Sequence, residues 1–355
     1  MQAIRKAIIA AASALLAAAL AGAAAAAFRR DAVSIPDGEK VYTSETFVMD
    51  TLLSQQAWGE GAEALIADVE ALAAGLESRW SAYQEDSVPD MVNKAAGKAP
   101  VTVPEKDFSI IEKVYGFSRQ SNGRFDLTVA PLTKLWGISA GRTAPPADRE
   151  IKAALELVGL SHIQLDRTAC SVFLDTPGAE LDFGGSMKGY AVEQALALYQ
   201  QSGITGGILD FGGNVAVTGT NPNREDGSFA IGLRDPLGEG YYGVLRAADK
   251  VICTSGGYER YFDYDGTRYH HILDPQTGWP AETDLLAVTV VGEDGLLCDC
   301  LSTLFFIEGL ESVQQHLDEP GYGLAVVDKE KRVWLSPSLK GSFSLRQESG
   351  YRLAE

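Results

Sequence analysis

The first part of the chain carries apolar residues at helical spacing, whereas the later part carries short apolar runs separated by glycines. In residues 60–80 apolar side chains recur every three or four positions, which predicts a long amphipathic helix. The same pattern predicts helices over 108–120 and 149–158, after a first strand over 41–49. The polar segment 86–100 is expected to be irregular.

Beyond residue 170 the pattern predicts many short strands and two further helices. The helices are expected over 188–201 and 296–307, and the strands over 172–175, 181–183, 207–211, 215–219, 229–234, 243–254, 269–273, 285–291, 324–327 and 333–335. Helices grouped first and strands grouped later indicate an α+β fold rather than a regular alternation of strand and helix.

The N-terminus has the layout of a secretory signal peptide. Residues 1–27 join Arg5 and Lys6 to a run of alanine and leucine that ends in small residues. About 20 apolar residues can also span a bilayer, so an uncleaved N-terminal membrane anchor stays open as the alternative. Either case predicts an exported protein, in the periplasm or at the outer face of the cytoplasmic membrane. We assign 28–40 to a linker, 41–340 to one domain and 341–355 to a C-terminal tail.

Charge and cysteine content narrow the classes of partner. The 355 residues carry a formal net charge of −18, which repels a polyphosphate backbone and argues against nucleic acid. The four cysteines, at positions 170, 253, 298 and 300, are interpreted as small buried side chains rather than as disulfides. No zinc-binding pattern of cysteine and histidine is present in the sequence.

Two glycine loops follow acidic residues at predicted strand ends. In the first, Asp182 precedes Gly184 and Gly185, and a helix is predicted to begin near Lys188. Glycines let a phosphate approach the backbone, and a helix N-terminus with a lysine attracts its charge. The second loop, 210–214, repeats the acidic residue and the paired glycines. Alone, the first loop is equally compatible with a simple turn, and the second favours a simple turn.

A third cluster, within residues 254–280, gathers hydroxyl, arginine and histidine side chains. Arg260 is suited to pair with a phosphate or with a carboxylate. His270 and His271 would face opposite sides of the strand predicted over 269–273, so at most one of them faces a given site.

Asp299 and Thr303 form a fourth candidate cluster, because residues four apart share a helix face. A carboxylate in such an apolar helix is costly unless it is paired or bound to a metal. Carboxylate and hydroxyl oxygens suit Mg²⁺, which also takes substrate phosphate as a ligand. The alternative is a helix-capping aspartate with an unrelated threonine.

Together these clusters resemble the ApbE family of FAD:protein FMN transferases. The resemblance runs from about residue 47 to residue 303 and rests on motifs in the same order, namely 49–51, 80–83, 125–132, 182–190, 254–280 and 298–303. It implies a T-fold-related α+β domain with a mixed or antiparallel sheet and flanking helices. Two departures stand out: Asp50 replaces the small residue usual after Met49, and Gly257 stands where an acidic residue is common.

The resemblance also implies roles for individual residues. The flavin pocket would be lined by Met49, Tyr83, Ala130, Pro131 and Leu132. The FAD nucleotide would contact Asp182, Lys188, His271 and Ile272, and Mg²⁺ would be held by the Gly185 carbonyl, Asp299 and Thr303. The residues expected to act in catalysis are His271, Lys188 and Asp299.

The expected reaction is Mg²⁺-dependent transfer of FMN from FAD to a threonine or serine hydroxyl of an acceptor protein, with release of AMP. By the resemblance, the acceptor would be an exported or membrane-bound electron-transfer protein with a short flavinylation motif, and the enzyme could itself associate with the membrane through its N-terminus. Two alternatives stay open: hydrolysis of FAD to FMN and AMP, and a flavin-binding carrier without chemistry.

Overall fold

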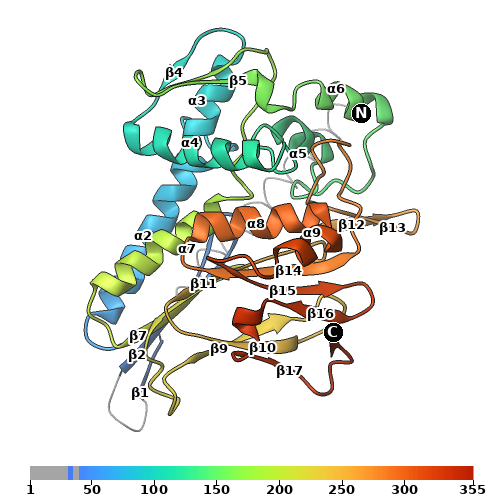
Figure 1. Ribbon diagram of the computed structural model, residues 1–355. Helices are drawn as coiled ribbons and strands as arrows, with labels where there is room; N and C mark the ends of the chain where they lie inside the picture. Colours follow the sequence, from blue (N-terminus) through green and yellow to red (C-terminus); the bar gives the residue numbers. More distant parts are fainter. Residues whose placement is uncertain (1–30, 35–39, 355) are drawn as a thin grey trace, which may run out of the picture.

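A large sheet forms the centre of the computed structural model, which describes residues 31–34 and 40–354 (Figure 1). All neighbouring strands of this sheet are antiparallel except the edge pair β16–β18. Its ten strands run in the order β1 (Asp31–Ser34), β2 (Lys40–Val48), β3 (Thr51–Trp58), β7 (Gly206–Phe211), β8 (Asn214–Gly219), β11 (Lys250–Gly256), β14 (Leu285–Gly292), β15 (Gly323–Asp328), β16 (Arg332–Leu335) and β18 (Arg352–Leu353).

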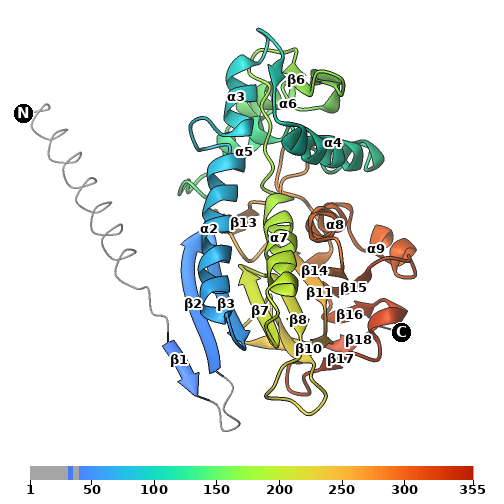
Figure 2. The same cartoon turned by 90° about the vertical axis from the view of Figure 1, so that its left-hand side faces the viewer.

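Different layers cover the two faces of this sheet. One face packs against the helices α2 (Ala62–Trp80), α7 (Met187–Gln201) and α8 (Gly295–Glu308), and Figure 2 shows α2 and α7 running side by side along it. The other face packs against a second sheet, β9 (Phe229–Arg234), β10 (Tyr241–Ala247) and β17 (Phe343–Leu345). The central strands are therefore buried on both sides.

Strand β15 shows how this layering shapes the sequence. Every residue of Gly323–Asp328 is buried. Leu324 and Val326 join the core beneath the helices, whereas Ala325 and Val327 join the core between the two sheets. A strand buried on both faces needs an almost continuous apolar run, and this one has it.

The remaining elements lie at one end of the large sheet (Figure 1). They are α3 (Val88–Ala95), α4 (Glu105–Gln120), α5 (Ala130–Trp136), α6 (Asp148–Leu155), the small sheet of β4 (Val101–Thr102), β6 (Ser171–Leu174) and β5 (Ile163–Asp166), and the hairpin of β12 (Tyr261–Tyr264) and β13 (Thr267–His270). Helix α9 (Leu310–His316) follows α8 directly. This arrangement confirms the predicted α+β class with a mostly antiparallel sheet and flanking helices.

The helices predicted from periodicity are confirmed, with small shifts at their ends. Four other expectations need correction. The segment 86–100 contains α3, which begins at a Ser87 cap. The segment 181–183 is not a strand; the neighbouring Glu180 forms a single isolated β-bridge, with Val129. The segment 243–254 contains parts of two strands, β10 and β11, which belong to different sheets. Strand β13 ends at His270, so His271 lies just outside that strand.

The expected domain boundaries also look different in the structure. Part of the predicted linker forms β1, which pairs with β2. The predicted tail supplies β17 and β18, which pair with β10 and β16, so the folded domain continues past residue 340. The segment 1–27 lies outside the described residues. Within the described ranges no helix is long and apolar enough to cross a bilayer. All four cysteines are free; Cys253, Cys298 and Cys300 are buried as expected, whereas Cys170 is only half-buried.

Candidate active site

Two glycines let helices α7 and α8 cross closely enough to assemble the site. A Cβ atom on Gly189 would lie 2.1 Å from the Gly295 carbonyl oxygen and 2.5 Å from the Asp299 Cβ. A Cβ on Gly295 would lie 2.3 Å from the Gly189 carbonyl oxygen. Any larger residue at either position would push the helices apart, so these glycines bring Asp299 to the loop that precedes α7.

The carboxylate of Asp299 is held at this crossing. Its Oδ2 accepts a hydrogen bond of 2.8 Å from the Gly189 amide, and the residue is 4% exposed. Within the described ranges no other hydrogen bond reaches this side chain, so Oδ1 keeps its lone pairs. A buried carboxylate that is only partly satisfied is costly, which points to a cation as its second partner.

Thr303 lies one helical turn beyond Asp299 and faces the same loop. Its Oγ1 would lie 3.8 Å from a Cβ built on Gly185, so the hydroxyl and the glycine loop are neighbours. Ser255, at the end of β11, places its Oγ 3.2 Å from the Thr303 Oγ1 and 2.8 Å from the Ser302 Oγ. The structure therefore brings the three predicted magnesium ligands, Gly185, Asp299 and Thr303, to one place.

These donors fit a small hard cation. A carboxylate oxygen, a hydroxyl and a loop carbonyl are oxygen ligands of the kind that Mg²⁺ accepts, with water and substrate phosphate completing its shell. In the part of the chain that the structure describes, no group of three or more His, Cys, Asp or Glu side chains could hold a metal by itself. A set with a single carboxylate depends on the substrate for further ligands, as Mg²⁺ sites on nucleotides do.

Lys188 supplies positive charge at the start of α7. Its side chain is half-buried and makes no ion pair or hydrogen bond with any described residue. Its charge nevertheless acts on Asp210, lowering the pKa of a carboxyl that burial raises, and it lowers the pKa of His271. An ammonium group that lies among these residues without an anionic partner is suited to bind a phosphate.

Asp182 connects the glycine loop to the predicted flavin pocket. Its Oδ1 accepts a hydrogen bond of 2.7 Å from the Gly184 amide, and its Oδ2 accepts one of 3.0 Å from the Thr133 hydroxyl in α5. The first turn of α5 contains Ala130, Pro131 and Leu132, the predicted pocket residues. Asp182 therefore has a structural role, whether or not it also contacts a ligand.

Met49 lies in the tight turn between β2 and β3. Met49 and Asp50 have φ values of 54° and 57°, and Val48 pairs with Thr51, which defines a two-residue hairpin turn with both central residues left-handed. The Met49 amide donates a hydrogen bond of 3.1 Å to Glu77 Oε1. Tyr83, the other predicted pocket residue from this region, is 71% exposed, so an aromatic ring is available to a ligand.

His271 is held as a neutral base. Its amide and its Nδ1 lie 3.1 Å and 3.3 Å from the Arg260 carbonyl oxygen. Because a carbonyl only accepts, Nδ1 carries the proton and Nε2 keeps a free lone pair. Burial lowers the pKa of His271 to about 3, and the positive charges of Arg260 and Lys188 act in the same direction. Its neighbour Ile272 is buried in the core, and its carbonyl accepts a bond from Ala281.

His270 differs from His271 as the sequence predicts. Its Nε2 lies 3.2 Å from the Ala281 carbonyl oxygen, and its ring packs edge-on against Phe306 in α8. A Cβ on Gly257 would lie 2.7 Å from this ring. The His270 ring therefore occupies the space that a larger residue at position 257 would need.

The sequence did not predict the surroundings of two polar residues near the site. Ser255 binds the Thr303 hydroxyl, and Asn214 has a fully buried amide with no hydrogen-bond partner among the described residues. The only signal in the sequence was that each belongs to a cluster of glycines and polar residues at a strand end. For Arg260 the sequence predicted a phosphate or a carboxylate as partner, and the structure pairs it with the Asp50 carboxylate.

The sequence and the structure both resemble known proteins. Residues 49–327 match the ApbE family. The chain is 33% identical to a FAD:protein FMN transferase of Klebsiella pneumoniae, over 89% of this chain and 98% of that protein. It is 32% identical to a FAD:protein FMN transferase of Treponema pallidum, over 73% and 75% of the two chains.

Solved structures agree with this result. The ApbE protein of Thermotoga maritima superposes with a TM-score of 0.78 and 29% identity, covering 85% of this chain and 99% of that one. The apo form of the Pseudomonas stutzeri flavinyl transferase ApbE gives a TM-score of 0.69 and 28% identity, covering 82% and 92%. From the sequence match and the shared fold, the chain belongs to the ApbE family.

Proposed function

We propose that this protein transfers FMN from FAD to a serine or threonine hydroxyl of an acceptor protein and releases AMP. One observation carries the proposal: Asp299, Thr303 and the Gly185 loop meet at the N-terminus of α7, where Lys188 has no anionic partner among the described residues. Oxygen ligands for a hard cation beside a free ammonium group are what a diphosphate substrate requires. The names of the relatives in K. pneumoniae and T. pallidum support the same activity.

In this reaction the acceptor oxygen attacks the FMN-side phosphorus of FAD. The bond from that phosphorus to the bridging oxygen breaks, and AMP leaves with the electron pair. Lys188 would bind a diphosphate oxygen, and the Nε2 of His271 would take the hydroxyl proton. Gly185, Asp299 and Thr303 would hold Mg²⁺, which neutralises charge on the diphosphate.

The test is incubation of the full chain with FAD, MgCl₂ and candidate acceptor proteins. Intact-mass measurement of the acceptor should show the addition of one FMN less water, with an equal amount of AMP released and no reaction in EDTA. FMN and AMP formed without any modified acceptor would establish FAD hydrolysis instead. FAD that stays intact in the presence of Mg²⁺ and every acceptor would favour a carrier and refute the proposal.

We also propose that the protein acts outside the cytoplasm, on an electron-transfer acceptor that carries a serine- or threonine-containing motif. The layout of residues 1–27 supports export. Fractionation of cells that produce the full chain, followed by N-terminal sequencing, would test this proposal. Recovery of the uncleaved chain in the cytoplasm would contradict it.

A further inference from the structure

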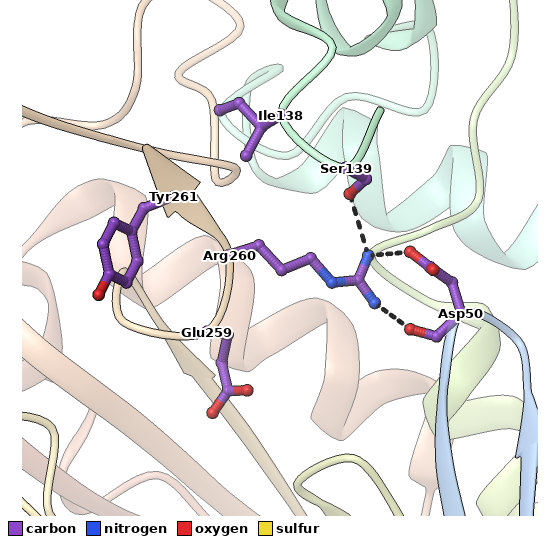
Figure 3. Close-up of a pocket in the computed structure, with 6 residues that line it drawn as sticks. All are labelled: Asp50, Ile138, Ser139, Glu259, Arg260 and Tyr261. Atoms are coloured by element: carbon purple, nitrogen blue, oxygen red, sulfur yellow. Dashed lines mark hydrogen bonds and ion pairs between the residues drawn. The ribbon is translucent and has the colours of Figure 1, made fainter. Parts of the chain in front are cut away.

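Arg260 lines a pocket together with Asp50, which follows Met49 in the turn between β2 and β3. The pocket measures about 300 Å³ and is lined by Asp50, Ile138, Ser139, Glu259, Arg260 and Tyr261 (Figure 3). Arg260 lies 2.8 Å from the Asp50 carboxylate, through Nη1 and Oδ2, and donates a bond of 2.7 Å from Nη2 to the Asp50 carbonyl. It donates a third bond of 3.3 Å, from Nη1 to the Ser139 hydroxyl. The planar fork of arginine suits these converging acceptors.

The backbone of Arg260 contacts His271, the residue predicted to accept the proton. The Arg260 carbonyl lies within hydrogen-bond distance of the amide and the Nδ1 of His271. Arg260 therefore contacts the residue that would receive the proton and, through its side chain, the turn that carries Met49. No other residue that lines this pocket makes hydrogen bonds to both His271 and the Met49–Asp50 turn.

Contacts from outside hold the Met49–Asp50 turn, because the Met49 amide donates a hydrogen bond to Glu77 Oε1 and Arg260 binds Asp50. Both residues are in the left-handed region, which is unfavourable for a side chain as large as methionine. Glycine, asparagine and aspartate are the residues that two-residue turns of this kind prefer, so Asp50 suits its position and Met49 is the strained residue. The second carboxylate of the pocket does not compete for Arg260, since Glu259 pairs with Arg234 at 3.5 Å. Asp50 is thus the partner of Arg260 in this pocket.

We propose that Arg260 is a positioning residue, and that its ion pair with Asp50 is a latch that keeps the Met49 turn in the geometry that binds FAD. This inference rests on the proposed function and adds to it a contact between the Met49–Asp50 turn and the residue whose carbonyl contacts His271. The pair is partly exposed, with 33% of the Arg260 side chain and 62% of the Asp50 side chain accessible. Such pairs add little to global stability, so the latch should affect FAD binding more than folding.

Three variants test the latch in the full chain, with FAD affinity measured by flavin fluorescence and turnover measured with the acceptor. Asp50→Asn keeps the carbonyl contact and removes the charge, and should raise the KM for FAD about threefold with kcat nearly unchanged. Arg260→Lys loses the fork and should weaken FAD binding about tenfold. The double variant should bind no more weakly than Arg260→Lys, because the two residues act as one unit.

Two controls are the dependence on ionic strength and a variant that removes a different exposed ion pair. The difference between wild type and Asp50→Asn should shrink as ionic strength rises, which a purely steric role would not produce. Glu293→Gln removes another exposed ion pair, Lys250–Glu293 at 2.7 Å, and should leave FAD binding unchanged.

Three outcomes would overturn the inference. If wild type binds FAD and the folded variants bind it equally well, the latch is refuted while the proposed function stands. If Glu293→Gln weakens binding as much as Asp50→Asn, the effect belongs to surface charge in general. If wild type binds no FAD, the proposed function and the latch fail together. Should Arg260→Lys not fold, Asp50→Asn alone decides between these outcomes.

Discussion

Replacing Gly189 by alanine tests whether the close crossing of α7 and α8 holds the active site together. The added Cβ would lie 2.1 Å from the Gly295 carbonyl oxygen, whereas relaxed non-bonded contacts lie at roughly 3.5 Å. Both nearest groups belong to a helix backbone or to the Cβ of Asp299, and neither can rotate away. The two helices must therefore separate by about 1 Å or more.

The energetic cost follows from opposing effects. Alanine in a helix interior is favoured over glycine by about 1 kcal/mol. Overpacking costs about 1–3 kcal/mol, and losing the charged hydrogen bond from the Gly189 amide to Asp299 costs about 1.5–3 kcal/mol. We expect a net loss of about 1.5–5 kcal/mol in the free energy of unfolding, which lowers the Tm by several degrees.

Thermal unfolding and Mg²⁺-dependent FMN transfer give the two measurements. The matched control is Gly75→Ala in α2, where the new Cβ would meet nothing within 4 Å, so the Tm should rise slightly. In Gly189→Ala the Mg²⁺ concentration needed for half-maximal activity should also rise, because Asp299 moves away from the loop. A Gly189→Ala protein with a raised Tm and normal Mg²⁺ dependence would refute the crossing as the organiser of the site.

Three further predictions address single side chains. Asp299→Asn keeps the shape and removes the charge, and should abolish the response of FMN transfer to added Mg²⁺ while the protein stays folded by circular dichroism. The pKa of His271 is lowered to about 3 in the folded protein, whereas the same histidine in the unfolded chain has a pKa near 6.5. The contribution of neutral His271 to the free energy of unfolding is therefore complete above pH 6.5 and is lost as the pH falls toward 3. Urea unfolding between pH 4 and 6.5 should therefore show a flatter pH dependence for His271→Gln than for wild type, and equal slopes would contradict the assignment. Asn214→Leu removes a buried amide that has no described partner, and should leave the Tm unchanged or raise it. Thr218→Val in the same strand breaks a hydrogen bond of 2.8 Å to Asp249 and should lower the Tm. A lower Tm in both variants would show that the Asn214 amide is hydrogen-bonded.

Local patterns in the sequence were sufficient for the long helices but not for several short elements. Helix α2 was predictable because its buried residues recur at helical spacing through Ala62, Leu65, Ile66 and Val69. Helix α3 was missed because its eight residues are too few to show a clear helical period, although the Ser87 cap and the following proline were visible. The segment 243–254 was predicted as one strand, although the turn at Asp249, with a φ of 49°, separates β10 from β11.

The site was predictable where its geometry lies within one element. Asp299 and Thr303 share a face of α8, as their spacing required. The contact of Ser255 with Thr303 joins residues 48 apart, and the contact of Arg260 with Asp50 joins residues 210 apart. Such contacts depend on strand order in the large sheet, which periodicity does not determine.

Each local motif in this protein also satisfies a purely structural explanation. Both oxygens of Asp182 bind protein groups, and Asp210 accepts a bond of 2.7 Å from the Gly213 amide across its turn. Considered singly, these loops are turns, and no single motif shows whether its residues serve catalysis or only the fold. The distinction lies in Asp299 Oδ1 and the Lys188 ammonium, which have no partners among the described residues, and Asp299 binds the amide of Gly189, the residue next to Lys188 at the start of α7. Because the helix crossing at Gly189 brings Asp299 to the start of α7, a substitution at Gly189 should disrupt the assembled site while every site residue is still present.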